Sequence, residues 1–220
     1  MKIVKSWDNI WDTVFSNQEW GKYPDTALIQ FIARNFYSKV RPQVKILEIG
    51  CGPGANIWYL DREGFLAYGI DGSSVAIEKA KQRIPNANLC VGDITKLEYD
   101  DNFFDAVIDC ECLYANNTSN SELILTEINR VLKKDGFFYS RTFSNSMYVG
   151  NEKSKPANYE YKNVEEGPLQ GKGFVRLIDR QGIKELYGNQ FDIISIDKLE
   201  YTQFNEKEII SEWIIISKKK

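Results

Sequence analysis

The sequence predicts one α/β domain: a doubly wound, mostly parallel sheet of seven strands with an antiparallel last strand, preceded by a helical N-terminal segment. The chain has 220 residues, enough for one well-buried core but not for two full-sized domains. From residue 44 onward, short apolar runs alternate with amphipathic stretches, a pattern typical of βαβ units. A glycine-rich turn also joins the first apolar run directly to a helical stretch.

The first five strands are expected where apolar runs end at turn residues, and helices are expected between them. Ser73 is a suitable N-cap for one of these helices, and Pro85 ends it. The expected strands are 44–50, 65–71, 88–91, 104–109 and 136–143, and the expected helices are 55–63, 74–83 and 121–132.

The C-terminal part of the chain is expected to begin with a long polar insertion over residues 141–173, a length that is often functional in a compact domain. A helix over 179–187 and strands over 191–201 and 211–217 follow. About ten residues separate the last two strands, which is too few for a crossover. They are therefore expected to pair as an antiparallel hairpin.

Residues 1–43 form a separate helical element in this prediction, ahead of the main domain over 44–220. Trp7, Trp11 and Phe15 fall on one face of a helix, and a second helix is expected over 25–37. The aromatic stripe either packs onto the domain as core, or forms a lid that presents Trp11, Trp20 and Tyr23 to an acceptor pocket.

Composition excludes several classes of function. The chain contains no histidine, so catalysis by a His base and His-ligated zinc or iron are excluded. Its net charge of −3 disfavours non-specific nucleic-acid binding. No leader pattern and no stretch long enough to span a membrane is found, so a cytoplasmic location is expected.

The four cysteines are expected to be buried, reduced thiols. They include no CxxC pair, so no metal site is predicted. Strand alternation would place Cys110 and Cys112 on one face. The cysteines are Cys51, Cys90, Cys110 and Cys112.

The turn Gly50-Cys-Gly52-Pro-Gly54-Ala carries the main chemical signal. Its glycines allow a tight turn and bring a ligand against bare backbone at a helix N-terminus. The spacing fits the GxGxxA fingerprint of dinucleotide-binding proteins, and Asp71 lies about 20 residues further on, where a carboxylate holds a ribose. The turn alone does not distinguish between cofactor classes.

Over residues 44–217 the chain resembles the class I S-adenosylmethionine-dependent methyltransferases, which have a Rossmann-like fold. Five segments match the family motifs in order. They are the glycine turn with Glu48, Gly69-Ile-Asp71-Gly-Ser, Gly92-Asp93-Ile94, the fourth strand ending at Asp109, and Glu127 to Gly136. The resemblance implies that S-adenosylmethionine is held by Glu48, Gly50, Cys51, Gly52, Gly54, Asp71, Gly72, Ser73, Asp93, Ile94 and Asp109.

The resemblance also implies roles for these residues. Glu48 faces the cationic end of the cofactor, Asp71 holds the ribose, Asp93 binds the adenine amino group beside Ile94, and Asp109 supports the ammonium group. An independent physical argument agrees, because these acids lie at or near the carboxyl ends of four successive predicted strands, the edge where open α/β sheets bind ligands. Four carboxylates repel a pyrophosphate but suit a sulfonium and an ammonium.

Glu111 and Tyr114, just beyond the fourth strand, are the candidates for a catalytic base or an acceptor clamp. The segment Asp109-Cys-Glu111-Cys lacks the Pro-Pro-aromatic signature of enzymes that methylate nucleic-acid bases. We therefore expect a small-molecule acceptor, such as a sugar or another polar metabolite, that is methylated on oxygen or nitrogen. Neither a nucleic acid nor a membrane is expected as a partner. The alternatives are an NAD(P)-dependent oxidoreductase, for which no Tyr-x-x-x-Lys donor is found, and a non-catalytic cofactor-binding module.

Overall fold

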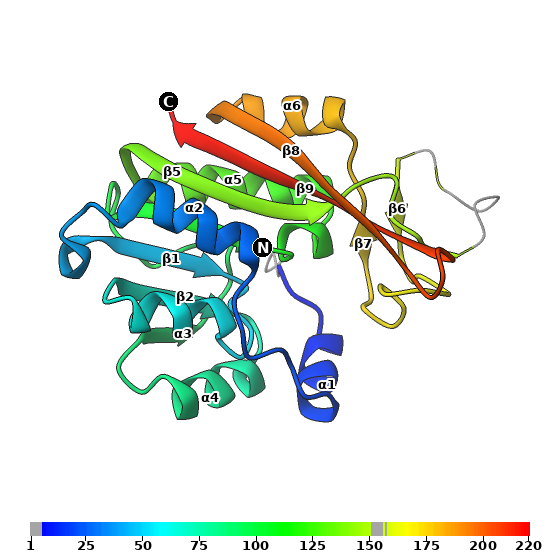
Figure 1. Cartoon of the computed structure of the whole chain (residues 1–220), viewed down its shortest axis with the longest axis horizontal. Helices are drawn as coiled ribbons and strands as arrows, with labels where there is room; N and C mark the ends of the chain where they lie inside the picture. The colour runs from blue at the N-terminus through cyan, green and yellow to red at the C-terminus, as the bar shows by residue number, and fades with distance from the viewer. Residues whose placement is uncertain (1–5, 151–155, 157) are drawn as a thin grey trace, which may run out of the picture.

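Figure 1 shows the computed structural model of the chain, which describes residues 6–150, 156 and 158–220. Within that part of the chain, seven strands form one sheet in the order β3-β2-β1-β4-β5-β9-β8. The strands of this sheet are β1 (Lys45–Ile49), β2 (Leu66–Asp71), β3 (Asn88–Val91), β4 (Phe104–Cys110), β5 (Leu132–Phe143), β8 (Phe191–Gln203) and β9 (Glu208–Lys219). The helices are α1 (Ile10–Asn17), α2 (Thr26–Phe36), α3 (Ala55–Arg62), α4 (Ser74–Arg83), α5 (Thr118–Val131) and α6 (Arg180–Gly188), with short 3-10 helices η1 (Arg41–Gln43) and η2 (Leu113–Ala115).

The strand order reverses between β1 and β4. β1 pairs in parallel with both β2 and β4, and the chain then builds outward from this pair in two directions. Open α/β sheets bind ligands at such a switch point, beyond the carboxyl ends of the strands. The fold therefore places the segments that follow β1 and β4 beside each other at the ligand-binding edge.

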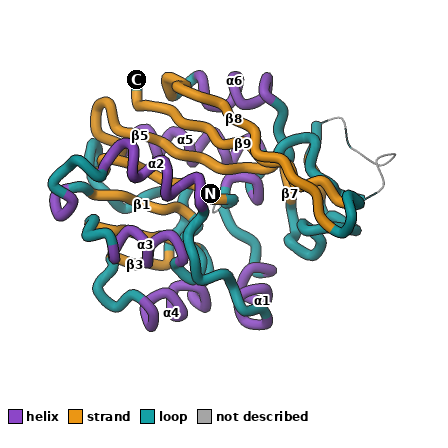
Figure 2. The backbone as a smooth tube through the Cα atoms, viewed as in Figure 1, coloured by secondary structure: helices purple, strands orange, loops and turns teal. Residues whose placement is uncertain are grey.

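The last two strands form the expected hairpin. β9 runs antiparallel to β5 on one side and to β8 on the other, so the antiparallel last strand is confirmed. The hairpin turns at Phe204, Asn205 and Glu206, which all have positive φ. In Figure 2 its far end extends past β5 and lies alongside β7.

Helices cover both faces of the sheet. Residues of α2, α3 and α4 pack on one face, and α5 and α6 pack on the other. Asp25 caps α2 by accepting hydrogen bonds from two backbone N–H groups, and the ring of Phe31 of this helix packs at a tilt, 5.1 Å away, against the buried Tyr139 of β5. Because α2 belongs to the core, the lid expected over 1–43 concerns only the segment before Thr26.

Helix α1 lies beyond the carboxyl edge of the sheet, against α4 (Figure 1). Asp12 accepts a hydrogen bond from Ser73, and Lys79 donates one to the carbonyl of Phe15. The helix begins only at Ile10, so Trp7 lies outside it. The expectation that one helix face carries residues 7, 11 and 15 is therefore wrong at its first position.

The insertion has more structure than the sequence indicated. β6 (Glu160–Tyr161) and β7 (Val175–Arg176) pair antiparallel, and a third apolar cluster forms around them. This cluster includes Met147 and Leu169 of the insertion and reaches Tyr114 of η2. The insertion is therefore anchored next to the carboxyl end of β4.

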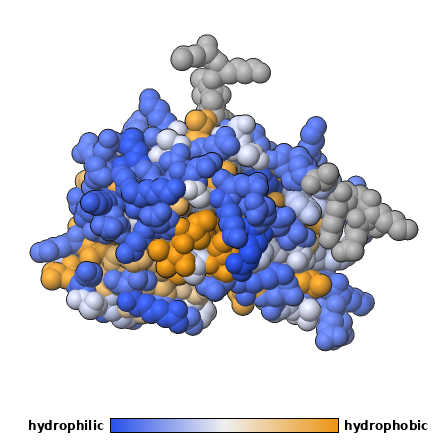
Figure 3. Space-filling model, turned by 90° about the horizontal axis from the view of Figure 1, so that it is seen from above, coloured by the Kyte–Doolittle hydropathy of each residue, from blue (hydrophilic) through white to orange (hydrophobic). Residues whose placement is uncertain are grey.

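Among the described residues, no helix is both long and apolar enough to cross a bilayer. The face in Figure 3 is mostly hydrophilic, with a hydrophobic area near its centre and smaller hydrophobic areas toward its edges.

Candidate functional site

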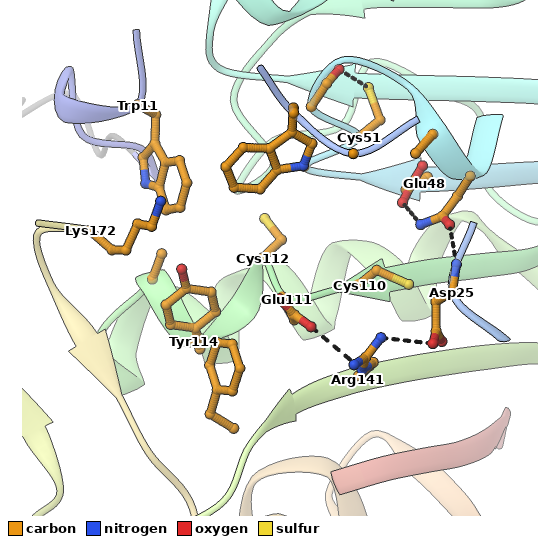
Figure 4. A pocket seen from close by; sticks show the side chains of 18 of the residues that line it. Trp11, Asp25, Glu48, Cys51, Cys110, Glu111, Cys112, Tyr114, Arg141 and Lys172 are labelled. Atoms are coloured by element: carbon orange, nitrogen blue, oxygen red, sulfur yellow. Dashed lines mark hydrogen bonds and ion pairs between the residues drawn. The ribbon is translucent and has the colours of Figure 1, made fainter. Parts of the chain in front are cut away.

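A cavity of about 550 Å³ opens at the carboxyl ends of β1, β2 and β4, and Figure 4 shows it from close by. Its walls come from the glycine-rich turn, the loop after β4, the segment before α2, the insertion and the hairpin. A volume of this size is typical of small-molecule sites. Of the residues expected from the sequence, the cavity brings together Trp11, Trp20, Tyr23, Glu48, Gly50, Cys51, Gly52, Asp71, Gly72, Ile94, Glu111 and Tyr114.

The glycine turn is built as the spacing predicts. Gly50 and Gly52 have φ angles of 60° and 51°, in the left-handed region that favours glycine. A side chain on Gly50 would overlap Cys112, and a Cβ on Gly52 would lie 3.5 Å from the ring of Phe15. The turn therefore leaves bare backbone at the cavity wall.

Gly54 and Ser73 do not line the cavity, and their expected contact with the cofactor stays a prediction. Gly54 is the N-cap of α3 with φ 83°, and a Cβ there would lie 2.8 Å from Ile84. It allows α3 to start close to α4. Ser73 is the N-cap of α4, where its hydroxyl accepts from the N–H of Ala76 and donates to Asp12.

Glu48 is 2% exposed, yet its Oε2 finds no hydrogen-bond partner among the described residues. Its Oε1 accepts a hydrogen bond from Asn56 Nδ2 at 2.6 Å. Burial raises the pKa of Glu48 to about 8, against the opposing effect of the Asn56 hydrogen bond. A buried oxygen without a partner is costly unless a ligand satisfies it. Glu48 therefore fits a cationic ligand group, supported by an Asn56 that no sequence motif indicated.

Asp71 joins two turns at the cavity wall. Its Oδ2 accepts from the N–H of Gly52 and its Oδ1 from the N–H of Ser73, both at 2.8 Å. Burial raises its pKa, and these two hydrogen bonds partly offset that effect. An ionised carboxylate has roughly four acceptor positions, so Asp71 keeps two for a ligand.

Trp7 forms part of the cavity wall, a role that no sequence motif indicated. It lies directly over Gly72, where any side chain would overlap its indole. The neighbouring Ser6 accepts a hydrogen bond from the N–H of Ile94 at 3.3 Å. The N-terminal segment thus bridges the ends of β2 and β3 and adds a flat aromatic surface beside Ile94.

Asp93 lies next to this wall but does not line the cavity. It accepts hydrogen bonds from the N–H and the hydroxyl of Thr95 at 2.9 and 2.7 Å. These bonds and those from Ser6 outweigh the effect of burial and lower its pKa. In this arrangement Asp93 organises the loop after β3, and its expected contact with the cofactor stays a prediction.

Asp109 is fully buried and does not line the cavity, and its expected contact with the cofactor stays a prediction. It accepts hydrogen bonds from the N–H groups of Cys112 and Leu113 and from the hydroxyl of Ser140 at 2.6 Å. Burial raises its pKa to about 6 despite these bonds. Its structural role is to shape the loop that carries Glu111.

Arg141 of β5 contacts three carboxylates in the cavity wall. The distances are 2.7 Å to Asp25 Oδ1, 2.5 Å to Glu212 Oε2 and 3.4 Å to Glu111 Oε1 (Figure 4). Glu111 has φ 60°, a conformation that costs a non-glycine residue energy and is frequent at functional sites. Burial raises its pKa to about 7, and Arg141 opposes this effect.

Tyr114 is 3% exposed and packs edge-on against Phe143 at 4.7 Å. In Figure 4 its hydroxyl points into the cavity toward Trp11 and Lys172. Burial raises the pKa of Tyr114. The ammonium of Lys172 lies 5.1 Å from the ring centroid of Trp20, and Trp11 meets that ring at 6.3 Å, so aromatic rings and one cation close this end.

The cysteines depart from expectation at two points. Cys90 is exposed, so the prediction of four buried thiols is wrong for it, whereas Cys51 is buried. Cys110 and Cys112 pack on opposite faces of the sheet because the left-handed Glu111 interrupts the strand between them. Burial raises the pKa of all three cavity cysteines, which are therefore neutral thiols.

Comparison with known proteins gives the family. Residues 47–140 match the family model described as a methyltransferase domain. An uncharacterized methyltransferase of Schizosaccharomyces pombe is 31% identical over 103 residues, which are 45% of this chain and 71% of that protein. The chain belongs to the methyltransferase family. The methyltransferase is also 30% identical over 99 residues to an uncharacterized methyltransferase of Synechocystis, and spans about half (47%) of its length.

Solved structures of methyltransferases share the fold. A SAM-dependent methyltransferase from Methanosarcina mazei superimposes with a TM-score of 0.71 at 19% identity, over 90% of this chain and 98% of that one. The 1,6-didemethyltoxoflavin-N1-methyltransferase of Burkholderia thailandensis, with S-adenosylhomocysteine bound, gives 0.61 at 15% identity over 89% and 79%. The predicted class I family, Rossmann-like fold, enzyme class and S-adenosylmethionine cofactor are confirmed, which rejects the NAD(P) alternative.

Proposed function

We propose that this methyltransferase transfers the methyl group of S-adenosylmethionine to a small molecule enclosed in the cavity. One observation carries the proposal: the glycine turn with Glu48 and Asp71, and the loop with Glu111 and Tyr114, open into the same cavity of about 550 Å³. The first set suits the cofactor and the second set the acceptor. Displacement at a methyl carbon requires the two molecules to lie side by side and in line.

The residues on the cofactor side fit S-adenosylmethionine, which supplies a methyl group activated by a sulfonium. The unpaired Oε2 of Glu48 would accept the ammonium group. Asp71 would hold the ribose hydroxyls with its remaining lone pairs. Ile94 and Trp7 would flank the adenine, and the bare backbone at Gly52 would allow close approach.

The charge of the whole cavity lining favours a small-molecule acceptor over a nucleic acid. Among the described residues that line the cavity, five acids stand against two cations. Such a wall repels phosphate groups. The acids are Asp25, Glu48, Asp71, Glu111 and Glu212, and the cations are Arg141 and Lys172. The small-molecule acceptor of the Burkholderia neighbour agrees with this choice, although that likeness shows only the fold.

Two further features belong to the proposal. The segment before Thr26 acts as a lid, since Trp11, Trp20 and Tyr23 line the cavity from outside the sheet. The enzyme works in the cytoplasm, because its described cysteines are free thiols, as is usual in a reducing compartment.

Calorimetric titration with S-adenosylhomocysteine tests the proposal. Wild type is expected to bind it, and Asp71→Ala is expected to bind it about 10- to 150-fold more weakly, as for loss of a hydrogen bond to a charged group. The control is Asp192→Ala, an exposed acid on β8 far from the cavity lining. Equal affinity of Asp71→Ala and wild type would place the cofactor elsewhere.

A further inference from the structure

The acceptor side of the cavity holds more negative than positive charge. Arg141 is surrounded by Asp25, Glu111 and Glu212, all of which line the cavity. One guanidinium cannot neutralise three ionised carboxylates, and when the Lys172 ammonium at the same end of the cavity is counted as well, an excess of up to one negative charge remains. Charges that are mostly removed from water interact strongly with a ligand that enters beside them.

Two of the three carboxylates are already satisfied within the protein. Asp25 Oδ2 accepts hydrogen bonds from Tyr139 at 2.8 Å and from the N–H of Leu28 at 3.0 Å, besides its ion pair with Arg141. Glu212 Oε2 accepts two N–H groups of Arg141, and its side chain is 4% exposed.

Glu111 is the available member of the group. Its distance to Arg141 is the longest of the three at 3.4 Å, and its side chain is 34% exposed, more than that of Glu212 or Asp25. Its left-handed backbone presents the carboxyl between Tyr114 and Arg141 in Figure 4. The negative charge that a ligand can reach is therefore centred on Glu111.

Tyr114 gives a second and independent indication of a polar ligand. The residue is 3% exposed, and its hydroxyl, which points into the cavity, makes no hydrogen bond with a described residue. Because the hydroxyl faces the cavity rather than packed protein, it can donate to or accept from a molecule bound there. Phe143 packs edge-on against the Tyr114 ring at 4.7 Å, and Trp11 and Trp20, whose ring centroids lie 5.7 and 5.1 Å from the Lys172 ammonium, line the same cavity.

We propose that the acceptor is a small amine, bound through its ammonium group to Glu111 and within reach of the Tyr114 hydroxyl. This inference rests on the proposed function and specifies the class of its acceptor. Anionic acceptors such as carboxylates or phosphates would face the excess acid around Arg141. An alcohol would gain nothing from that charge and would have to lose a far more tightly held proton.

The chemistry balances with the groups present. Glu111 takes one proton from the ammonium, which leaves a neutral amine with a free electron pair. That pair forms the bond from nitrogen to the methyl carbon, and the bond from carbon to sulfur breaks with its electrons on sulfur. Glu111, whose pKa burial raises to about 7 while Arg141 opposes this effect, exchanges protons near neutral pH.

Calorimetry on the enzyme saturated with S-adenosylhomocysteine tests the proposal directly. The probes are 2-phenylethylamine, benzylamine, cyclohexylamine and butylamine, each compared with its matched alcohol and carboxylate. At least one amine is expected to bind wild type about tenfold or more tightly than its alcohol, with the carboxylate weakest. In Glu111→Gln this preference is expected to disappear.

Matched variants separate the possible outcomes. Glu78→Gln, an exposed acid on α4, is expected to keep the preference for amines. Tyr114→Phe is expected to weaken amine binding without changing the affinity for S-adenosylhomocysteine. The amine proposal is overturned if no amine binds more tightly than its alcohol, or if Glu111→Gln retains the preference. If wild type fails to bind S-adenosylhomocysteine at all, the proposed function itself is wrong.

Discussion

Replacing Glu48 by Gln changes cofactor binding and the stability of the ligand-free protein in opposite directions. The amide keeps the shape of the side chain and an oxygen for Asn56, but it removes the charge from the buried position that has no partner. A hydrogen bond between charged groups is worth about 1.5–3 kcal/mol. We therefore expect S-adenosylhomocysteine to bind Glu48→Gln about 10- to 150-fold more weakly.

The stability effect follows from the pKa of Glu48. Burial raises it from 4.5 to about 8, so the folded protein keeps this proton over a range in which the unfolded chain has released it. Stability consequently falls as the pH rises through that window. Gln does not titrate, so ligand-free Glu48→Gln is expected to be more stable than wild type at about pH 8, by a few kcal/mol at roughly 1.4 kcal/mol per pKa unit. The stabilities of the two proteins should differ little near the lower end of this pH window, where the unfolded chain also keeps the proton.

Thermal unfolding at about pH 5 and about pH 8, with and without S-adenosylhomocysteine, measures both effects. A change of 1 kcal/mol moves the midpoint of a chain of this size by about 2–4 °C. Glu78→Gln serves as control because its carboxyl is exposed. The reasoning is refuted if Glu48→Gln binds the ligand as wild type does, or if its midpoint at the higher pH is below that of wild type.

Three further predictions concern other parts of the site. Trp7→Ala is expected to weaken binding of S-adenosylhomocysteine about tenfold in calorimetry, which corresponds to the loss of one stacking contact between an aromatic ring and a base. An unchanged affinity would show that Trp7 does not contact the cofactor. Gly54→Val is expected to lower the free energy of unfolding in urea by about 1–3 kcal/mol, because its φ of 83° and the contact with Ile84 leave no room; equal stability would contradict this packing. Deletion of residues 1–17 is expected to leave a folded protein that binds S-adenosylhomocysteine more weakly and no longer transfers methyl groups; an unfolded product in circular dichroism would show that this segment is core.

The parts of the fold that repeat a local pattern could be predicted from the sequence. Each parallel strand is an apolar run that ends at a turn, and β3 has the predicted limits, Asn88–Val91. Helix α5 starts at Thr118 rather than at residue 121, because Asn117 caps it within a polar run that reads as loop. β5 begins at Leu132 because that residue pairs with Phe104 before a bulge.

The cofactor half of the site was predictable for a similar reason. Glu48, Asp71 and the glycines lie within single strand-to-helix turns, so short spacings place them at one edge of the sheet. The local pattern does not show which acids reach the cavity. Asp109 lies at the end of β4 much as Asp71 lies at the end of β2, yet its side chain is fully buried and accepts hydrogen bonds from two backbone N–H groups.

The acceptor half could not be predicted, because its residues meet only through tertiary structure. Arg141 lies in β5, and its three carboxylates come from the start of α2, the loop after β4 and the hairpin. No spacing in the sequence links Asp25 to Glu212. The hairpin places Glu212 opposite Phe143 in the β5–β9 ladder, close to Arg141 on the same strand.

The cofactor side and the acceptor side of the cavity each present a buried acid to a cationic group. Glu48 on the cofactor side and Glu111 on the acceptor side both have pKa values raised by burial, to about 8 and about 7. Each is therefore costly to ionise until a cation arrives, and each cation that binds favours the ionised form. Binding on either side should release protons near neutral pH, and an ammonium on the acceptor side completes the neutralisation that Arg141 alone leaves unfinished. In this proposal, the buried acids favour an amine because its positive charge offsets their ionisation.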